Sequence, residues 1–250
     1  MSVPRPTLTG MNTGTPQPPS KSALRKAGSI MRKYLRNEAT LEEFQGAIRT
    51  MQAHRSRFNR PMVDLNTELR SLASDLSIEA SVTQRLKREA TILEKLCIRE
   101  PGLDFSRMQN IGGLRVVVDS LANLIRYDSA LCDRWSDRIV DRRDYISCPR
   151  DSGYRAIHVV VSESGLHLEV QLRSRRMHAW AQMVEGFSGQ LGENFKQDSG
   201  DHVIQRFARV LSELYAHEDE GTTPPAHLSA EFESLWIQVD AVLGTAEEEE

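Results

Sequence analysis

The stretch AIHVVVSESGLHLEVQLRS, residues 156–174, decides most of the fold. Two runs rich in valine and leucine flank the pair Ser164-Gly165, and a short turn of this kind joins two antiparallel strands into a hairpin. Apolar and polar residues alternate in the second run, so Glu169, Gln171 and Arg173 share one face of that strand. We therefore expect strands over 156–163 and 166–174, with the apolar face packed on helices.

The same patterns continue outward on both sides of this hairpin. Further strands are expected over residues 80–88, 113–119 and 138–145. Helices are expected in the region 22–76, and the third of them starts at about 63. Within that region Thr40 and Glu43 predict a helix start, as a cap and its reciprocal partner. Further helices are expected over 89–99, 121–135, from 175 to a glycine-containing break near 189–192, 203–217 and 228–242. This order predicts an α+β fold, with a mixed or mostly antiparallel sheet flanked by helices and helical extensions at both ends.

The composition is that of a soluble globular protein, with 39% hydrophobic and 27% charged residues. The formal net charge of −3 hides an uneven distribution. Residues 1–100 hold 17 basic and 10 acidic side chains, whereas residues 101–250 hold 15 and 25. A basic half indicates a surface for a polyanion such as a nucleotide or RNA, although ordinary solvated helix faces also explain it.

The ends of the chain differ from its middle. Residues 1–20 are rich in Pro, Thr, Ser and Gly and are expected to form a disordered arm. A single domain is expected over 21–245, with its core over 80–190, followed by an acidic tail over 246–250. No apolar run approaches the roughly 18 residues that span a bilayer, and the three cysteines are far apart. We therefore expect a cytoplasmic protein that does not contact membranes.

The first candidate functional segment is RLKREATILEK, residues 85–95. Lys87 precedes a predicted helix, and Thr91 and Lys95 are spaced to share one face of it. Cations beside a helix N-terminus favour an anion, and Arg85 has a planar group that can stack on a base. The alternative is a solvated basic helix.

The second candidate segment is DYISCPRDSGYRAIH, residues 144–158. A turn leads to Tyr154 at the mouth of a strand, and Arg143, Arg150 and Arg155 flank it. An aromatic ring among arginines is the composition of a stacking platform within a phosphate site. The alternative is a core tyrosine with arginines on its rim.

Two further features complete the candidate set. Glu169 is a carboxylate among cations, and it is therefore a candidate metal ligand or general base, unless its strand is an ordinary exposed edge. The segment MQNIGGLR, residues 108–115, has a Gly pair that lets the backbone approach a ligand closely before a strand. The Gly pair alone is weak, since it also suits a simple turn.

In order and spacing, these segments together resemble the synthetase domain of the RelA/SpoT family over about residues 80–190. The resemblance includes EVQLRS, residues 169–174, followed by Met177, His178 and Trp180. It implies a nucleotidyltransferase-like sheet and transfer of pyrophosphate from ATP to the 3′-hydroxyl of GDP or GTP, with Mg²⁺. The small single-domain alarmone synthetases are the members that the chain resembles in its flanks.

The resemblance also implies residue roles. Arg85 would stack on adenine, Tyr154 would stack on the acceptor base, and Glu169 would bind Mg²⁺ or take the hydroxyl proton. The ATP phosphates would be held by Lys87, Thr91 and Lys95. The acceptor would be met by Arg143, Arg150, His158 and Gln171.

One departure from the family pattern concerns the metal. The family has an aspartate that binds Mg²⁺ where this chain has Asn110, and an amide oxygen brings no charge to a hard cation. Two alternatives therefore stand beside the leading hypothesis: a nucleotide-binding regulator with weak catalysis, and a toxic relative that makes adenine alarmones or modifies the tRNA 3′ end. The sequence leaves open the acceptor, a homo-oligomer, tRNA binding and an antitoxin partner.

Overall fold

The computed structural model describes residues 17–192, 195 and 202–247. Most of the expected N-terminal arm and the last three residues of the expected acidic tail lie outside the described residues. The chain divides into two compact units, one made of the residues up to Arg57 with Leu93–Ser106, the other of Phe58–Ile92 with the residues from Arg107 on. The single domain expected over 21–245 stays a prediction, and the two units are described separately.

The second unit is built on a five-stranded sheet in the order β1-β2-β5-β4-β3. The strands are β1 Ala80–Leu86, β2 Gly112–Val118, β3 Ile139–Asp144, β4 Ile157–Glu163 and β5 Leu166–Ser174. Neighbouring strands are antiparallel except for β2 and β5, which run parallel, so the sheet is mixed as expected. All five predicted strands are confirmed, with ends that differ by one or two residues.

The β4–β5 hairpin is confirmed with the predicted turn. Ser164 and Gly165 both have positive φ angles, 51° and 73°. Positive φ at both central residues is the feature of the type I′ turn, whose twist matches that of the two strands. The turn thereby sets the register in which Val160 pairs with Glu169 and His158 pairs with Gln171.

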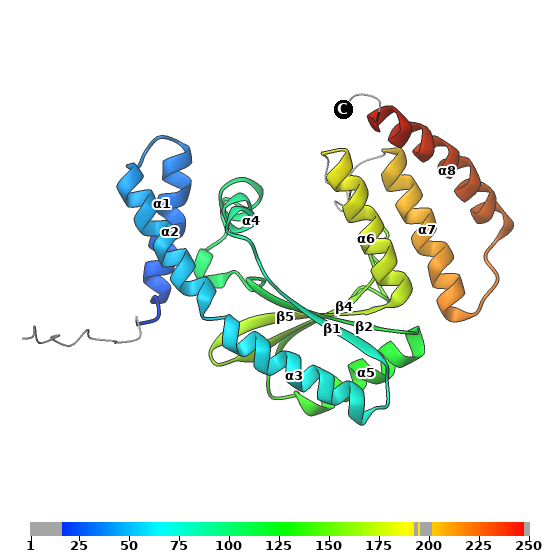
Figure 1. The fold of residues 1–250 in the computed structure, drawn as a ribbon, viewed down its shortest axis with the longest axis horizontal. Coiled ribbons are helices and arrows are strands. Elements are labelled where there is room, and N and C mark those ends of the chain that lie inside the picture. Colours follow the sequence, from blue (N-terminus) through cyan, green and yellow to red (C-terminus); the bar gives the residue numbers. More distant parts are fainter. Residues whose placement is uncertain (1–16, 193–194, 196–201, 248–250) are drawn as a thin grey trace, which may run out of the picture. The chain divides into compact units, whose positions relative to one another are not determined.

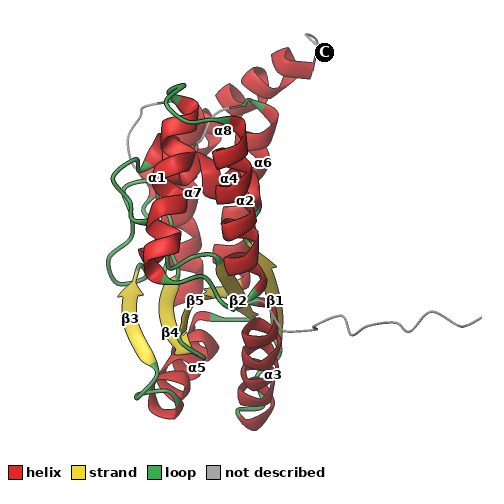
Figure 2. Cartoon of the chain, turned by 90° about the vertical axis from the view of Figure 1, so that its left-hand side faces the viewer, coloured by secondary structure: helices red, strands yellow, loops and turns green. Residues whose placement is uncertain are grey.

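Helices cover both faces of this sheet (Figures 1 and 2). Helices α3 (Asn59–Asp75) and α5 (Leu121–Arg134) pack on one face, against the buried side chains Leu114, Val116 and Val118 of β2. Helix α3 begins at Asn59 rather than near residue 63. Pro61 lies inside its first turn, where a missing backbone N–H costs nothing, so this proline does not delay the helix start.

The C-terminal helices α6 (Arg175–Gln190), α7 (Val203–Glu220) and α8 (Ala226–Glu247) lie above the other face (Figure 1). They share an apolar cluster that includes Trp180, Ile204, Phe207 and Leu235, all buried. Trp180 also donates its indole N–H to the backbone carbonyl of Ala208 at 2.7 Å. This contact joins α6 to α7 close to the sheet. The predicted C-terminal helices are thus confirmed, with α7 and α8 longer than expected.

The first unit contains α1 (Lys21–Leu35), α2 (Leu41–Ser56), the π-helical turn η1 (Lys95–Arg99) and most of the 3₁₀ turn η2 (Phe105–Arg107). The predicted helix start at Thr40 is confirmed, because Thr40 and Glu43 form a reciprocal capping box. The helix expected over 89–99 is confirmed in its extent, but its type changes along the chain. Glu89–Glu94 form the α-helix α4, and Lys95–Arg99 continue it as the π-helical η1, so Lys95 and Thr91 do not share one α-helix. Among the described helices, none has both the length and the apolar character needed to cross a bilayer.

Candidate nucleotide-binding site

A cavity of about 540 Å³ opens on the face of the sheet that carries the polar residues of β5. All of its lining residues belong to the second unit. They are Thr83, Gln84, Arg85, Lys87, Thr91, Asn110, Gly113, Leu114, Arg115, Arg150, Tyr154, His158, Glu169, Gln171, Arg173 and Glu185. The lining is rich in cations and hydrogen-bond donors, which suits a polyanionic ligand.

Strand register brings the central residues of this cavity together. Arg115 of β2 and His158 of β4 both pair with Gln171 of β5, and Gly113 pairs with Glu169. Paired residues of neighbouring strands point to the same face, so these side chains form adjacent rows across the sheet. Gly113 has no side chain, and its bare backbone leaves space beside Glu169.

Five of these side chains form a closed ring of polar contacts. The Tyr154 hydroxyl lies 2.7 Å from Nε2 of His158, and Nδ1 of His158 lies 3.2 Å from Oε1 of Glu169. Gln171 donates from Nε2 to Oε2 of Glu169 at 3.0 Å. Arg173 closes the ring, because Nη2 donates to the Tyr154 hydroxyl at 2.8 Å and to Oε1 of Gln171 at 3.1 Å.

The charge state of Glu169 follows from these contacts. Burial by itself raises the pKa of this carboxyl, but the hydrogen bond and charge of His158 oppose it. The amide of Gln171 and the charge of Lys87 act in the same direction, and together they hold the pKa of Glu169 below its usual value. Glu169 is therefore an ionised carboxylate at neutral pH.

Two arginines lie side by side in the lining. Burial and the charge of Arg173 lower the pKa of Arg115, whereas Glu185 and Tyr154 oppose that shift. Arg173 is only 3% exposed, and its guanidinium carbon lies 5.2 Å from the centre of the Tyr154 ring. In the described part of the chain, Nε and Nη1 of Arg173 and Nε of Arg115 are buried with no hydrogen-bond partner. Such donors favour an anion in the cavity.

Most residues singled out from the sequence meet in this cavity. They are Arg85, Lys87, Thr91, Asn110, Arg150, Tyr154, His158, Glu169 and Gln171. Arg143 is an exception: it pairs with His158 in the sheet, but its exposed side chain bonds Asp141 at 3.0 Å and does not line the cavity. Lys95 belongs to the first unit, where Nζ lies 3.3 Å from Glu100.

Three charged lining residues had been given no role from the sequence: Arg115, Arg173 and Glu185. Strand parity could have found the two arginines, since Arg115 alternates with Gly113 and Arg173 alternates with Glu169 and Gln171. Glu185 lies on α6, and no local pattern shows which face of that helix reaches the sheet.

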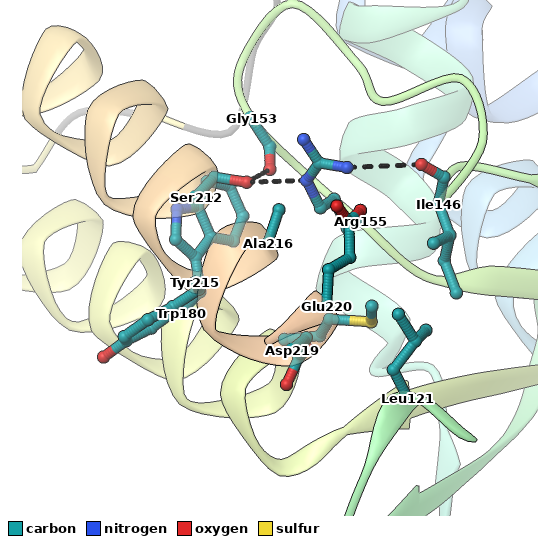
Figure 3. Close-up of a pocket in the computed structure, with 11 residues that line it drawn as sticks. Leu121, Ile146, Gly153, Arg155, Trp180, Ser212, Tyr215, Ala216, Asp219 and Glu220 are labelled. Atoms are coloured by element: carbon teal, nitrogen blue, oxygen red, sulfur yellow. Dashed lines mark hydrogen bonds between the residues drawn. The ribbon is translucent and has the colours of Figure 1, made fainter. Parts of the chain in front are cut away.

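The segment that carries Tyr154 is held by helix α7, as Figure 3 shows. The Ser212 hydroxyl donates to the carbonyl oxygen of Gly153 at 2.5 Å and accepts from Nε of Arg155 at 3.2 Å. Arg155 also donates from Nη1 to the carbonyl oxygen of Ile146 at 3.2 Å. Beside these contacts only a cavity of about 20 Å³ remains, room for roughly one water molecule.

Glycine is the residue type that fits at position 153, next to α7. Its φ is +86°, and a Cβ there would lie 3.0 Å from Cβ of Ser212 and 3.1 Å from Cα of Arg209. A larger residue would both strain the backbone and push the segment away from α7. The close approach of Gly153 to α7 therefore sets the position of the adjoining Tyr154.

Two residues of the cavity lining carry oxygen atoms of the kind that a divalent cation binds. Oδ1 of Asn110 is buried and, among the described residues, has no hydrogen-bond partner. Glu169 supplies an ionised carboxylate in the same cavity. Mg²⁺ commonly binds through one or two carboxylates together with water and substrate phosphates, so this donor set fits it. The described residues contain no group of three or more His, Cys, Asp or Glu that could hold a metal alone.

Comparison with known protein families matches almost the same part of the chain as the one that lines the cavity. Residues 84–190 match the family model described as a region found in RelA / SpoT proteins. The GTP pyrophosphokinase YjbM of Bacillus subtilis is 33% identical over 154 residues, which are 56% of this chain and 73% of that protein. The GTP pyrophosphokinase rsh of Brucella melitensis is 32% identical over 114 residues, which are 45% of this chain but only 15% of that longer protein.

Solved structures agree with the fold. Small alarmone synthetase 1 from B. subtilis, bound to its product pppGpp, superposes with a TM-score of 0.55 and 26% identity, covering 66% of this chain and 90% of that one. Small alarmone synthetase 2 from B. subtilis superposes with a TM-score of 0.57 at 20% identity, covering 68% and 95%. The second likeness concerns the fold alone.

Proposed function

Because this chain belongs to the RelA/SpoT family, we propose that it is a pyrophosphokinase that transfers pyrophosphate from ATP to the 3′-hydroxyl of GDP or GTP. The observation that carries the proposal is the cavity itself, in which cations from β1, β2, β5 and the Tyr154 segment lie around the ionised carboxylate of Glu169. A reaction between two polyphosphates needs positioning and charge neutralisation more than covalent chemistry. The arrangement supplies both.

The donor would occupy the β1 side of the cavity. Arg85 would stack on adenine, and Lys87 and Thr91 would meet the triphosphate. The phosphate contact expected for Lys95 stays a prediction, because Lys95 belongs to the first unit. Arg115 adds a cation with a buried, unpartnered donor on the same lining. Its buried position strengthens an ion pair with phosphate compared with one on the surface.

The acceptor would occupy the side formed by β4 and the Tyr154 segment. Tyr154 would offer one face of its ring to the guanine, since Arg173 lies over the ring. Arg150 would meet the 5′ phosphates, and it is held by Tyr145, whose hydroxyl accepts from its Nη2 at 3.0 Å. Arg143 would reach the acceptor phosphates only after its side chain leaves Asp141. His158 and Gln171 would line this side.

Glu169 is suited to take the proton of the attacking hydroxyl. The 3′-oxygen would form a bond to the β-phosphorus of ATP, and the bond from that phosphorus to the oxygen of the α-phosphate would break, releasing AMP. The hydroxyl proton would pass to the Glu169 carboxylate, whose two oxygens are oriented by His158 and Gln171.

A bound Mg²⁺ would neutralise negative charge on the transferred phosphates. Glu169 and the buried amide oxygen of Asn110 would hold it.

The test offers ATP and Mg²⁺ with GDP, GTP, ADP and tRNA in parallel and identifies the products by mass spectrometry. We expect guanosine 3′-pyrophosphates and AMP in equal amounts. Product formed with ADP but with neither GDP nor GTP would instead support a toxic relative that makes adenine alarmones. Product formed only with tRNA would support a relative that modifies the tRNA 3′ end, which the net charge of +7 on residues 1–100 motivates. Nucleotide binding without any product would support a catalytically weak regulator.

A further inference from the structure

We propose that Arg173 is the positioning residue of this site, from which two hydrogen-bonded chains run to the two oxygens of Glu169. This inference deepens the proposed function and rests on it for its catalytic part. One chain passes through Tyr154 and His158 and ends on Oε1. The other passes through Gln171 and ends on Oε2.

The direction of the shorter chain is fixed by chemistry. A guanidinium can only donate and an ionised carboxylate can only accept. Gln171, which lies between Arg173 and Glu169, must therefore turn its oxygen to the arginine and its NH₂ group to the glutamate. No flipped amide satisfies both contacts.

The longer chain has a defined direction by the same reasoning. Nδ1 of His158 faces Glu169 at 3.2 Å, so a neutral imidazole must carry its proton on Nδ1 to avoid opposing lone pairs. Nε2 is then an acceptor, and the Tyr154 hydroxyl donates to it at 2.7 Å. Tyr154 can give its only proton to His158 because its oxygen accepts from Arg173 at 2.8 Å.

The ring gives Arg173 an effect on Glu169 that does not require contact between them. Loss of the guanidinium frees the Tyr154 hydroxyl and the Gln171 amide to rotate, and both oxygens of Glu169 lose a fixed donor. If the lone pairs of the Glu169 carboxylate do not point at the acceptor hydroxyl, the carboxylate accepts the hydroxyl proton poorly. We therefore expect loss of Arg173 to lower kcat more than it changes the affinity for either nucleotide.

The first measurement needs no turnover. In ¹⁵N-histidine-labelled full-length protein at about pH 9, where an ordinary imidazole is neutral, the ¹⁵N shifts report which nitrogen of His158 carries the proton. We expect the Nδ1–H tautomer in the unaltered protein. In Arg173→Met and in Tyr154→Phe, Glu169 still accepts from Nδ1, so the proton should stay there. We expect Nε2 to lose its hydrogen-bond donor, seen as a move of the Nε2 resonance towards its value in a free neutral imidazole. Arg175→Met is the matched control, because Arg175 lies two residues on and is exposed, with its partner Glu79 also exposed.

The second measurement is turnover with ATP and GDP. Arg173→Met is expected to lower kcat about 10–100-fold, with KM values changed less than threefold, whereas Arg175→Met is expected to match the unaltered protein. Tyr154→Phe keeps the charge of Arg173 and covers the case in which Arg173→Met does not fold. A proton on Nε2 of His158 in the unaltered protein overturns the proposal. So does an Nε2 resonance that stays in place in the folded variants, or one that moves while kcat is undiminished. A moved Nε2 resonance in a protein that makes no product in any form overturns the proposed function and leaves the ring standing.

Discussion

The hydroxyl oxygen of Tyr154 lies 2.7 Å from Nε2 of His158, so the residue with the proposed stacking ring is also tied to the proposed base. Nδ1 of the same imidazole faces Glu169 at 3.2 Å. In the proposed reaction, recognition of the acceptor and removal of its proton would therefore be linked through one histidine. The two contributions of Tyr154, from its ring and from its hydroxyl, can be measured separately.

Replacement of Tyr154 by Ala and by Phe should give different kinetic results. Tyr154→Ala removes the ring, and loss of stacking should weaken acceptor binding by about 1–3 kcal/mol, seen as a higher KM for GDP. Tyr154→Phe keeps the ring, so the KM for GDP should change little while kcat falls. An unaltered acceptor affinity in Tyr154→Ala would contradict the stacking role.

Glu169→Gln should lower turnover about 10²–10⁴-fold, because the amide cannot accept the hydroxyl proton.

The unaltered protein should also keep its activity at mildly acidic pH. The pKa of Glu169 is lowered, so the carboxylate stays ionised through the pH range in which an ordinary glutamate titrates. It loses its charge only as the pH falls through that lowered value. A kcat profile recorded from pH 4 to 8 measures this, and an acidic limb centred above pH 6 would argue against Glu169 as the base.

Asn110→Asp should increase the affinity for Mg²⁺, because a charged oxygen replaces a neutral one at the proposed metal site. The Mg²⁺ concentration that gives half-maximal turnover should fall by about tenfold. A matched control is Asn123→Asp, since Asn123 lies on α5 and bonds Asp119 outside the cavity. An unchanged Mg²⁺ dependence would remove Asn110 from the metal site.

Ser212→Ala should weaken acceptor use although Ser212 does not line the nucleotide cavity. Its hydroxyl holds Gly153 and Arg155, which flank Tyr154, and loss of such a hydrogen bond costs about 1 kcal/mol. The KM for GDP should rise about fivefold with the KM for ATP unchanged. Ser234→Ala on the exposed surface of α8 is the control, and equal effects of the two variants would contradict a specific role for Ser212.

His54 should make the protein less stable in acid. Burial, together with the charge of Arg57, lowers the pKa of His54 to about 4. The unfolded chain then binds a proton more readily than the folded one, so stability is lost as the pH falls from about 6.5 towards 4. Between pH 7 and 5 this group should cost about 2 kcal/mol. Urea unfolding of His54→Leu should show that much less pH dependence than the unaltered protein, while His167→Leu, at an exposed position, should not.

Local sequence was sufficient for the strands, the hairpin and the face that carries Glu169, Gln171 and Arg173. Alternation with period two and the Ser164-Gly165 turn act over a few residues, so neighbours in the chain specify them. The capping box at Thr40 and Glu43 was readable for the same reason. The π-helical turn at Lys95 could not be predicted from the sequence, because an α-helix and a π-helix satisfy the same apolar spacing over so short a stretch.

The composition of the site required distant parts of the chain to meet. Which residues of β2 lie beside Glu169 depends on the parallel register of β2 and β5, and no local pattern encodes that pairing. Contact between Ser212 and Gly153 spans 59 positions of the chain, and Glu185 reaches the cavity only because α6 packs on the sheet. Short-range periodicity therefore determines which side chains share a face of each strand. Burial of apolar surface between the sheet and the helices brings those faces to one cavity and allows the ring around Glu169 to close.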